Sequence, residues 1–409
     1  MSIQIIKMGS TKSSYKSLIF LFIFLNPLLY KLFRFPSILI SLILILVYLL
    51  KNTKQKISDK KFTQIFISIL LFYNSILLMV SLANVNISSN NNYIYIPEYT
   101  TIKQIFLGLI YNNIVFIFLI LYLLLIKDIE TYNRIEKFIF YFSGFSTIFN
   151  FIEVFYEPLH LFLVYKAGYE PNYFFVKRPV SILLNAYYNG FFSAFFTFLS
   201  IHYWVKTRNI IYIFLFSIGS IATILVSVRF SIIMLLLTLL IYILFNKSKI
   251  LIITLFIYMI VIVILIFAFL NKDYIILLTS IITTSDTVGS ADLHKYLFIE
   301  GLKAYVEHPL GIGIGKMDFG ALNTIEASHT ESYLLTILLQ GGFVSFIIFL
   351  LIHMLLIYKL KKYKFYHWFS FSIAILITSA INIQVLQSIT TASIVAFIYL
   401  PSLVRGYHE

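Results

Sequence analysis

The chain alternates between long apolar stretches and shorter polar segments over most of its length. A helix of about 20 apolar residues crosses the hydrocarbon core of a bilayer, so each stretch of that length is a candidate span. The alternation therefore predicts an all-α polytopic integral membrane protein with about 12 transmembrane helices. The predicted spans are 17–33, 35–50, 62–82, 104–126, 138–156, 189–205, 209–228, 230–245, 250–270, 331–358, 366–383 and 389–403.

The polar segments define a single membrane domain, 1–409, with two long connections at 157–188 and 271–330. The second connection separates the ninth and tenth spans and is predicted to contain a short helix. Ser290 suits its N-cap and Pro309 its end. The expected apolar face of this helix comprises Phe298, Leu302, Tyr305 and Val306. We expect the helix to lie against the membrane-facing rim of the bundle.

Composition agrees with a membrane protein, because 60% of residues are hydrophobic and only 12% are charged. The formal net charge of +14 raises the alternative of a nucleic-acid partner. However, 20 of the 31 Lys and Arg residues fall in the shorter set of alternating polar segments. The positive-inside rule then predicts a multi-pass membrane protein, in contact with membrane lipids and not nucleic acid. Both termini are expected in the cytoplasm and both long connections on the outer side.

Arg229 lies near the middle of 209–246, which contains no other Lys, Arg, His, Asp or Glu residue. Two spans fit on either side of it, which places the arginine at a very short outer turn or slightly within the membrane. A charge at that depth is costly unless it is paired or hydrated, so Arg229 is a functional candidate. The alternative is an interfacial arginine whose side chain reaches water.

Two further groups suit an anionic ligand. Lys177-Arg178 precedes a span on the outer side, where two adjacent cations would bind phosphate or pyrophosphate; a lipid-headgroup contact is the alternative. His308 is followed by Gly311 and Gly313, whose alternation permits close backbone approach to an anion. A simple turn between a loop helix and a span is the alternative there.

His329 stands directly before the tenth span, with Glu331 two positions later. A neutral imidazole accepts a proton near pH 7, and a neighbouring carboxylate orients it, so this pair is a candidate general base. A surface or capping histidine is the alternative. There are no cysteines, and no two Asp residues stand two positions apart. We therefore expect neither a thiolate metal site nor a metal-bound nucleotide sugar.

One acidic and one basic residue lie outside these groups. Glu153, near the end of the fifth span, is the buried acid that a transporter would require. His160 stands in the 157–188 connection with no supporting context.

Four segments together resemble the bacterial O-antigen polymerase and O-antigen ligase superfamily. These segments are Lys177-Arg178, Ser227-Val228-Arg229-Phe230-Ser231, Glu307-His308-Pro309-Leu310-Gly311-Ile312-Gly313, and His329-Thr330-Glu331-Ser332-Tyr333-Leu334 followed by Gly341-Gly342. The resemblance is most specific over about 290–350. The chain departs from the family where Thr330 stands at a position often occupied by Asn.

The resemblance implies a glycosyltransferase, independent of metals and cofactors, at the outer face of the bacterial inner membrane, with both long connections in the periplasm. Its substrate would be oligosaccharide linked to undecaprenyl pyrophosphate, and a chain-length regulator protein would be a candidate partner. His329, Arg229 and Glu331 would be catalytic, while Lys177, Arg178, His308, Gly311 and Gly313 would bind substrate. We expect a surface-polysaccharide polymerase; the alternatives are an O-antigen ligase that transfers polymer to lipid A-core, and a polysaccharide flippase or other transporter.

Overall fold

The computed structural model describes residues 60–84, 89–90, 95–96, 101–126, 128–167, 179–226, 228–246, 288–314, 332–381, 386 and 388–404. Nothing is described of the other residues. The described part is helical apart from a two-residue antiparallel pair, β1 (Ser89–Asn90) and β2 (Tyr95–Ile96). The helices are α4 (Lys60–Ala83), α5 (Ile102–Asn112), α6 (Ile114–Leu125), α7 (Ile129–Phe155), α8 (Glu157–Ala167), α9 (Ala186–Thr207), α10 (Ile211–Leu225), α11 (Arg229–Asn246), α14 (Val288–Glu307), α15 (Tyr333–Lys362), α16 (Tyr366–Thr378) and α18 (Ile389–Leu403).

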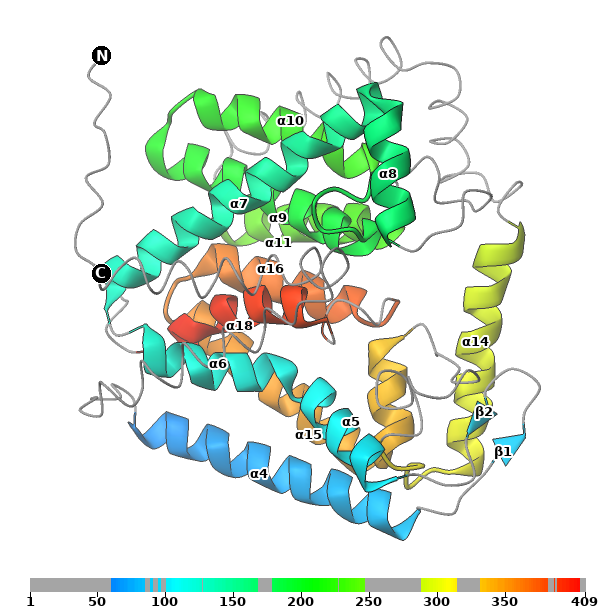
Figure 1. The fold of residues 1–409 in the computed structure, drawn as a ribbon. Coiled ribbons are helices and arrows are strands. Elements are labelled where there is room, and N and C mark those ends of the chain that lie inside the picture. Colours follow the sequence, from blue (N-terminus) through cyan, green and yellow to red (C-terminus); the bar gives the residue numbers. More distant parts are fainter. Residues whose placement is uncertain are drawn as a thin grey trace.

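The long helices form a bundle with two chemically different ends (Figure 1). At the end drawn on the right lie α8, α14 and the β1–β2 pair, and we call this the α14 end. The opposite end, called the basic end, contains the last turns of α9 and α15 with Lys206, Lys359, Lys361 and Lys362. The chain therefore separates its long polar connections from its clustered cations.

Nine of the predicted spans fall on described helices, and the spans predicted at 17–33, 35–50 and 250–270 lie outside the described residues. Four helices (α4, α7, α11 and α15) are long and apolar enough to cross a membrane, or five spans if α5 and α6 count as one. α10, α16 and α18 are shorter apolar helices. The described part is thus compatible with a polytopic membrane protein, and the count of twelve stays a prediction.

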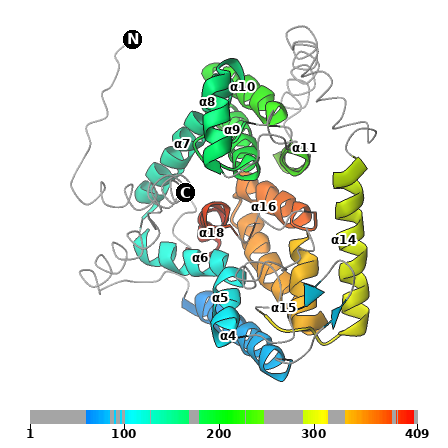
Figure 2. The same cartoon turned by 45° about the vertical axis from the view of Figure 1, so that its right-hand side comes forward.

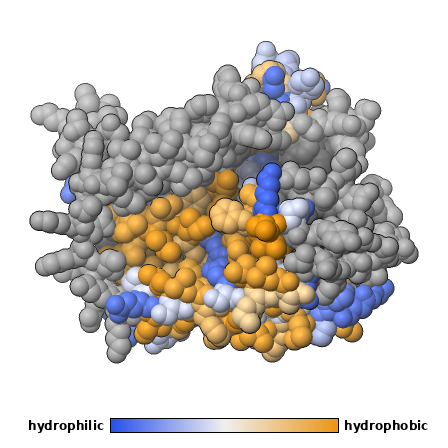
Figure 3. Space-filling view, turned by 60° about the horizontal axis from the view of Figure 1, so that its bottom comes forward, coloured by the Kyte–Doolittle hydropathy of each residue, from blue (hydrophilic) through white to orange (hydrophobic). Residues whose placement is uncertain are grey.

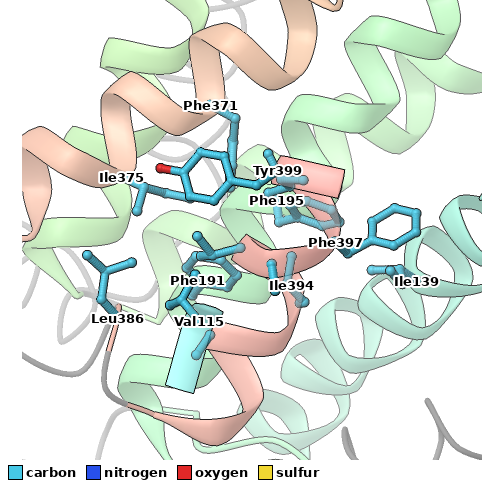
Figure 4. Packing of buried hydrophobic residues seen from close by; sticks show 14 of the residues in the cluster. Val115, Ile139, Phe191, Phe195, Phe371, Ile375, Leu386, Ile394, Phe397 and Tyr399 are labelled. Carbon is cyan, nitrogen blue, oxygen red and sulfur yellow. The ribbon is translucent and has the colours of Figure 1, made fainter. Parts of the chain in front are cut away.

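The core of the bundle is organised around α18 (Figure 2), which lies at the centre with other helices around it. From Thr390 to Leu403 every residue of α18 is buried. Figure 4 shows side chains of α6, α7, α9 and α16 around it, including Phe191 and Phe195 of α9 and Phe371 of α16. Phe397 stacks on Tyr132 of α7 with ring centroids 4.6 Å apart. A helix that is apolar on all sides is stable only in such a central position.

The face formed by α4, α5 and α6 is broadly hydrophobic (Figure 3). Leu71, Phe72 and Met79 are exposed on α4. A groove of about 240 Å³ between α4 and the α5–α6 pair is lined mainly by apolar side chains. Exposed apolar side chains on this scale are expected on a surface that meets lipid tails, because water would be excluded there.

The predicted continuous span 104–126 is wrong in one respect, because α5 and α6 meet at Asn113 with a bend of 60°. The Asn113 side chain donates to Leu109 O at 2.8 Å and to Asn74 Oδ1 of α4 at 2.6 Å. Asn74 Nδ2 returns a hydrogen bond to Asn113 Oδ1 at 3.2 Å. These side-chain hydrogen bonds satisfy polar groups at the break, which allows a membrane helix to be interrupted there.

The fifth span also begins earlier than predicted, since α7 starts at Ile129 and not near 138. Asp128 is its N-cap and accepts a hydrogen bond from Thr131 N at 2.6 Å. Glu130 and Arg134 form an ion pair one turn apart. Local capping thus extends the helix beyond its apolar stretch, which hydropathy alone does not reveal.

The helix predicted in the 271–330 connection is present as α14, which begins at Val288, two residues before the predicted cap. The predicted apolar face is only partly used: Phe298, Leu302 and Val306 are exposed, and Tyr305 is half-buried. The buried face instead contains Leu297, Glu300 and Ala304, and α14 packs on α15. The hydrogen bond from Lys303 to Glu300 raises the pKa of the Lys303 ammonium.

Candidate functional site

Arg229 is the first residue of α11, as the sequence predicted for an arginine that opens a span. Its side chain is half-buried. The N-terminus of a helix carries a positive partial charge, and the guanidinium adds a full charge at the same place. The positive end of α11 and the charge of the Arg229 guanidinium therefore both favour an anion at this place. A phosphate group has the geometry that a guanidinium recognises.

The start of α9 packs directly against the start of α11. A Cβ placed on Gly190 would come within 2.9 Å of Ser231 Oγ, so this glycine permits the close approach. Tyr187 stacks on Phe230 with ring centroids 6.2 Å apart. The N-cap of α9, Asn185, accepts hydrogen bonds from the next turn of the helix. The contact places the segment that follows Lys177-Arg178 in sequence beside the helix that begins with Arg229.

The turn His308–Ile314 is inserted between α4 and α15. Ile312 N donates to Leu339 O at 2.8 Å, and Gly313 N donates to Gln340 O at 3.0 Å. α15 breaks at Gly342, which has φ 70° and ψ −175°, so carbonyls just before the break lack their usual helical donors. The turn supplies those donors and so caps the first part of α15. We call this arrangement the glycine clasp.

The glycines of the clasp are required by close contacts between backbone segments. A Cβ on Gly311 would lie 2.6 Å from Gly342 N, and a Cβ on Gly342 would lie 2.6 Å from Leu310 C and O. A Cβ on Gly313 would lie 2.8 Å from Ser81 Cα. All three also have positive φ, which residues with a side chain rarely adopt. The predicted close backbone approach is therefore present, and its partner in the structure is the protein's own backbone.

The amides of the clasp are engaged within the protein. Gly311 N donates to His308 O at 2.9 Å, and Ile314 N donates to Ser81 Oγ at 2.8 Å. Asn84 Nδ2 donates to Gly311 O at 2.7 Å and ties the clasp to the end of α4. The amides of Ile312 and Gly313 donate to α15 and so are engaged within the protein. The clasp could therefore contribute to a binding site by its shape and position. Substrate binding by Gly311 and Gly313 stays a prediction.

The predicted acid–base pair lies outside the described residues, as do Lys177 and Arg178. His308 follows the last residue of α14 and is half-buried. α15 begins immediately after the predicted pair, with Ser332 as its N-cap accepting from Leu335 N at 3.2 Å. The tenth span therefore starts at Tyr333 and not at Glu331 as predicted.

The starts of α11 and α15 are connected through α16. α16 packs against both helices, and Ser379 O just beyond its end accepts a hydrogen bond from Tyr333 N at 2.9 Å. The described residues of the other three predicted segments thus lie at the start of α11, in the turn after α14, and at the start and break of α15, at the α14 end of the bundle (Figure 1). Within the described residues, no three His, Asp or Glu side chains gather as a metal site would require.

One ionisable pair at this end was not predicted as part of the site. Glu153 of α7 is 1% exposed, and its Oε2 lies 3.2 Å from His160 Nδ1 of α8. The same oxygen accepts a hydrogen bond from Val180 N at 2.9 Å. There was no sign of this pair in the sequence because α8 falls in a segment expected to be a loop, so the two residues were not expected on packed helices. The only available indication was that one is an acid and the other a base.

The described residues form a helical protein compatible with a polytopic membrane protein, with Arg229 and the glycine clasp at its α14 end. Residues 213–350 match the family model described as O-Antigen ligase. This segment is similar to the O-antigen polymerase and ligase superfamily, whose members are glycosyltransferase-like enzymes. The matched segment contains Arg229, the glycine clasp and His329, while Lys177 and Arg178 precede it. No curated protein matches the chain, and no solved structure does.

Proposed function

We propose that the protein is a surface-polysaccharide polymerase of the bacterial inner membrane. It joins repeat units carried on undecaprenyl pyrophosphate at the outer face, which we assign to the α14 end. The observation that carries this proposal is the match over 213–350, which includes three of the four candidate segments. The distribution of Lys and Arg supports the orientation, because clustered cations favour the cytoplasmic side. The match gives no support to a transporter.

Glycosyl transfer from a lipid pyrophosphate needs two kinds of group. The bond between the sugar and the pyrophosphate breaks, so negative charge develops on the leaving group and requires cations. Arg229, at the positive end of α11, is assigned this role together with Arg178 and Lys177. An acceptor hydroxyl attacks the sugar carbon and loses its proton, and His329 is assigned as the base that takes it. Glu331 orients His329, and no metal or cofactor enters these steps.

His308, Gly311 and Gly313 are assigned to substrate binding because the turn that they form holds neighbouring segments of the site in place. In the glycine clasp they connect the end of α14 to the break in α15. The N-cap of α15, Ser332, directly follows Glu331. The clasp caps the first part of α15, which follows His329 and Glu331 directly in sequence. This support is indirect, because it acts through the backbone and not through a contact with substrate.

The ligase is retained as a second candidate because the matching family model carries that description. Both enzymes break the same bond in the donor, so the cations and the base serve either reaction. They differ in the acceptor: another lipid-linked repeat unit for a polymerase, and lipid A-core for a ligase. A chain-length regulator protein is a candidate partner of the polymerase alone.

A deletion strain separates these reactions. It would be complemented with wild type, His329→Ala or Arg229→Ala, and both surface polysaccharide and lipid-linked sugars would be analysed. We expect the deletion and both variants to yield a single repeat on the acceptor where wild type restores a ladder. Full-length polymer retained on the lipid carrier would instead identify the ligase. A normal ladder in the deletion strain would contradict both activities.

A further inference from the structure

A buried hydrogen bond between two side-chain amides joins the two helix breaks of the bundle. Asn112 is the last residue of α5, directly before the bend to α6, and Gln340 lies two residues before Gly342 in α15. Asn112 Nδ2 donates to Gln340 Oε1 at 2.6 Å, and both side chains are buried. We call this contact the amide bridge. It connects residues that are 228 positions apart in the sequence.

Asn112 also contacts the first residue of α15. Its main-chain oxygen accepts a long hydrogen bond, 3.4 Å, from the buried hydroxyl of Tyr333. Tyr333 and Gln340 are about two helical turns apart. Asn112 therefore spans the segment of α15 between its N-cap, Ser332, and its break at Gly342. A break deprives such a segment of some helical hydrogen bonds, so contacts from outside determine its position.

This first segment of α15 carries the glycine clasp. Gln340 is held twice, because its main-chain oxygen accepts from Gly313 N at 3.0 Å while its side chain accepts from Asn112. The same segment contributes to a small hydrophobic cluster with α14, which comprises Ala304, Ile312, Leu335 and Leu339. The amide bridge thus attaches a unit made of α14, the clasp and the start of α15 to the end of α5.

We propose that Asn112 is a positioning residue for substrate binding. It acts through Gln340 on the glycine clasp and thereby fixes His308, whose main-chain oxygen accepts from Gly311 N at 2.9 Å. A hydrogen bond suits this role because it is directional, whereas an apolar contact buries the same area without fixing a register. The inference rests on the proposed function, in which His308 and the clasp bind the lipid-linked substrate.

A second pair of amides at the same bend provides a matched control. Asn113 and Asn74 bond to each other through their side chains, at 2.6 and 3.2 Å. They also donate to Leu109 O and Leu70 O, within α5 and α4, and they line the groove between these helices. Asn74→Leu should therefore lower stability as Asn112→Leu does, and it should leave the KM for lipid-linked oligosaccharide unchanged.

Asn112→Leu removes the donor of the amide bridge and keeps a side chain of similar size. Gln340 Oε1 is then buried without this donor, so the unfolding temperature should fall. We expect KM for lipid-linked oligosaccharide to rise about tenfold with kcat close to wild type. The reason is that a displaced clasp loses binding that the substrate keeps in both the ground state and the transition state.

Two paired variants separate positioning from plain packing. Asn112→Leu with Gln340→Met replaces both amides by apolar groups of similar shape, which should restore stability while KM stays raised. Asn112→Gln with Gln340→Asn keeps an amide bridge of the same total length, so KM should return towards wild type. A KM that recovers together with stability in the apolar pair would overturn the proposal. So would a KM that stays raised in the folded, swapped pair.

The variants would be purified, placed in bilayers and assayed with lipid-linked oligosaccharide extracted from the deletion strain, with thermal unfolding measured in parallel. The apolar pair decides the question if Asn112→Leu alone does not fold. In a His308→Ala background, Asn112→Leu should raise KM no further. Effects that multiply in this cycle, or an equal rise of KM in Asn74→Leu, would contradict the proposal.

Failure of the proposed function looks different from failure of the positioning role. If the proposed function is wrong, wild type itself does not elongate the extracted substrate. If wild type is active and folded Asn112→Leu has the wild-type KM, the positioning role alone is wrong.

Discussion

Two turns at the α14 end are held in place by different chemistry. One is held by the glycine clasp; the other is held by Glu153, Asn150 and Asn189 around the Pro179–Val180 peptide, which we call the carboxylate clasp. The first fixes the turn that follows α14, and the second fixes the turn that precedes α9. The glycine clasp does so by shape: Gly311 and Gly342 bring two backbones together, with a Cβ on either one 2.6 Å from its neighbour. The carboxylate clasp does so with side chains, since Glu153 and Asn189 each bind one edge of a single peptide.

This difference determines which substitutions each turn tolerates. A glycine at positive φ in close backbone contact has no conservative replacement, because any Cβ meets atoms that cannot move alone. A hydrogen-bonding side chain has at least one near-isosteric substitute that keeps its acceptor. The glycine clasp should therefore respond to every substitution, and the carboxylate clasp should respond selectively.

The largest expected effect is from Gly342→Val. A β-branched residue there would meet the Leu310 carbonyl and adopt φ 70°, so we expect the free energy of unfolding to fall by about 3 kcal/mol or more. Thermal unfolding in detergent measures the loss. Leu310→Ala is the matched control in the same turn, because Leu310 is 78% exposed. Equal stability of Gly342→Val and wild type would show that the clasp is not held by shape.

Asn189→Ala should have the next largest effect on stability. It leaves Pro179 O and Asn150 Oδ1 buried without the donor they have now, at a cost of about 2 kcal/mol. Asn189→Ser, which restores one donor, should recover part of the loss. The comparison would be weakened if Asn189→Ala unfolded at the wild-type temperature, because the carboxylate clasp would then contribute nothing.

Asn84→Ala removes a peripheral bond of the glycine clasp. Its amide donates to Gly311 O, and we expect a loss of about 1 kcal/mol, since the backbone contacts remain. The same unfolding assay applies, with Asn84→Gln as a variant that keeps the amide. A loss as large as that of Gly342→Val would mean that side-chain bonds, and not backbone shape, hold this turn.

The smallest predicted effect belongs to Asp128→Ala at the opposite end. Loss of this exposed N-cap of α7 should cost about 0.5 to 1 kcal/mol and leave transferase activity unchanged. Asp128→Asn should be nearly neutral, because it can still accept from Thr131 N. A drop in kcat/KM for Asp128→Ala at equal protein amount would show that the two ends of the bundle are coupled.

Sequence patterns predicted features that depend on local order. The absence of other charges around Arg229 indicated a helix start there, and α11 begins at that residue. Pro309 and the periodicity of 298–306 indicated α14. These signals succeed because hydropathy and capping act over a few neighbouring residues.

Features that depend on distant partners were missed. The break at Asn113 requires Asn74 from another helix, and the apolar run gives no sign of it. The role of the glycines depends on Gly342 and Ser81, which lie far from them in sequence. Glu153 and His160 become a pair only because α8 turns back on α7. Such contacts are set by tertiary packing and leave no periodic trace in a single sequence.

The most direct test of the account compares Arg229→Ala with Arg208→Ala in reconstituted protein. Arg208 lies at the basic end over the Trp204 ring, 5.4 Å from its centroid, so it controls for loss of an arginine. With lipid-linked oligosaccharide extracted from the deletion strain, we predict that Arg229→Ala lowers elongation about 10²-fold or more. Arg208→Ala should elongate like wild type. Normal elongation by folded Arg229→Ala would contradict the assignment of glycosyl transfer to the α14 end.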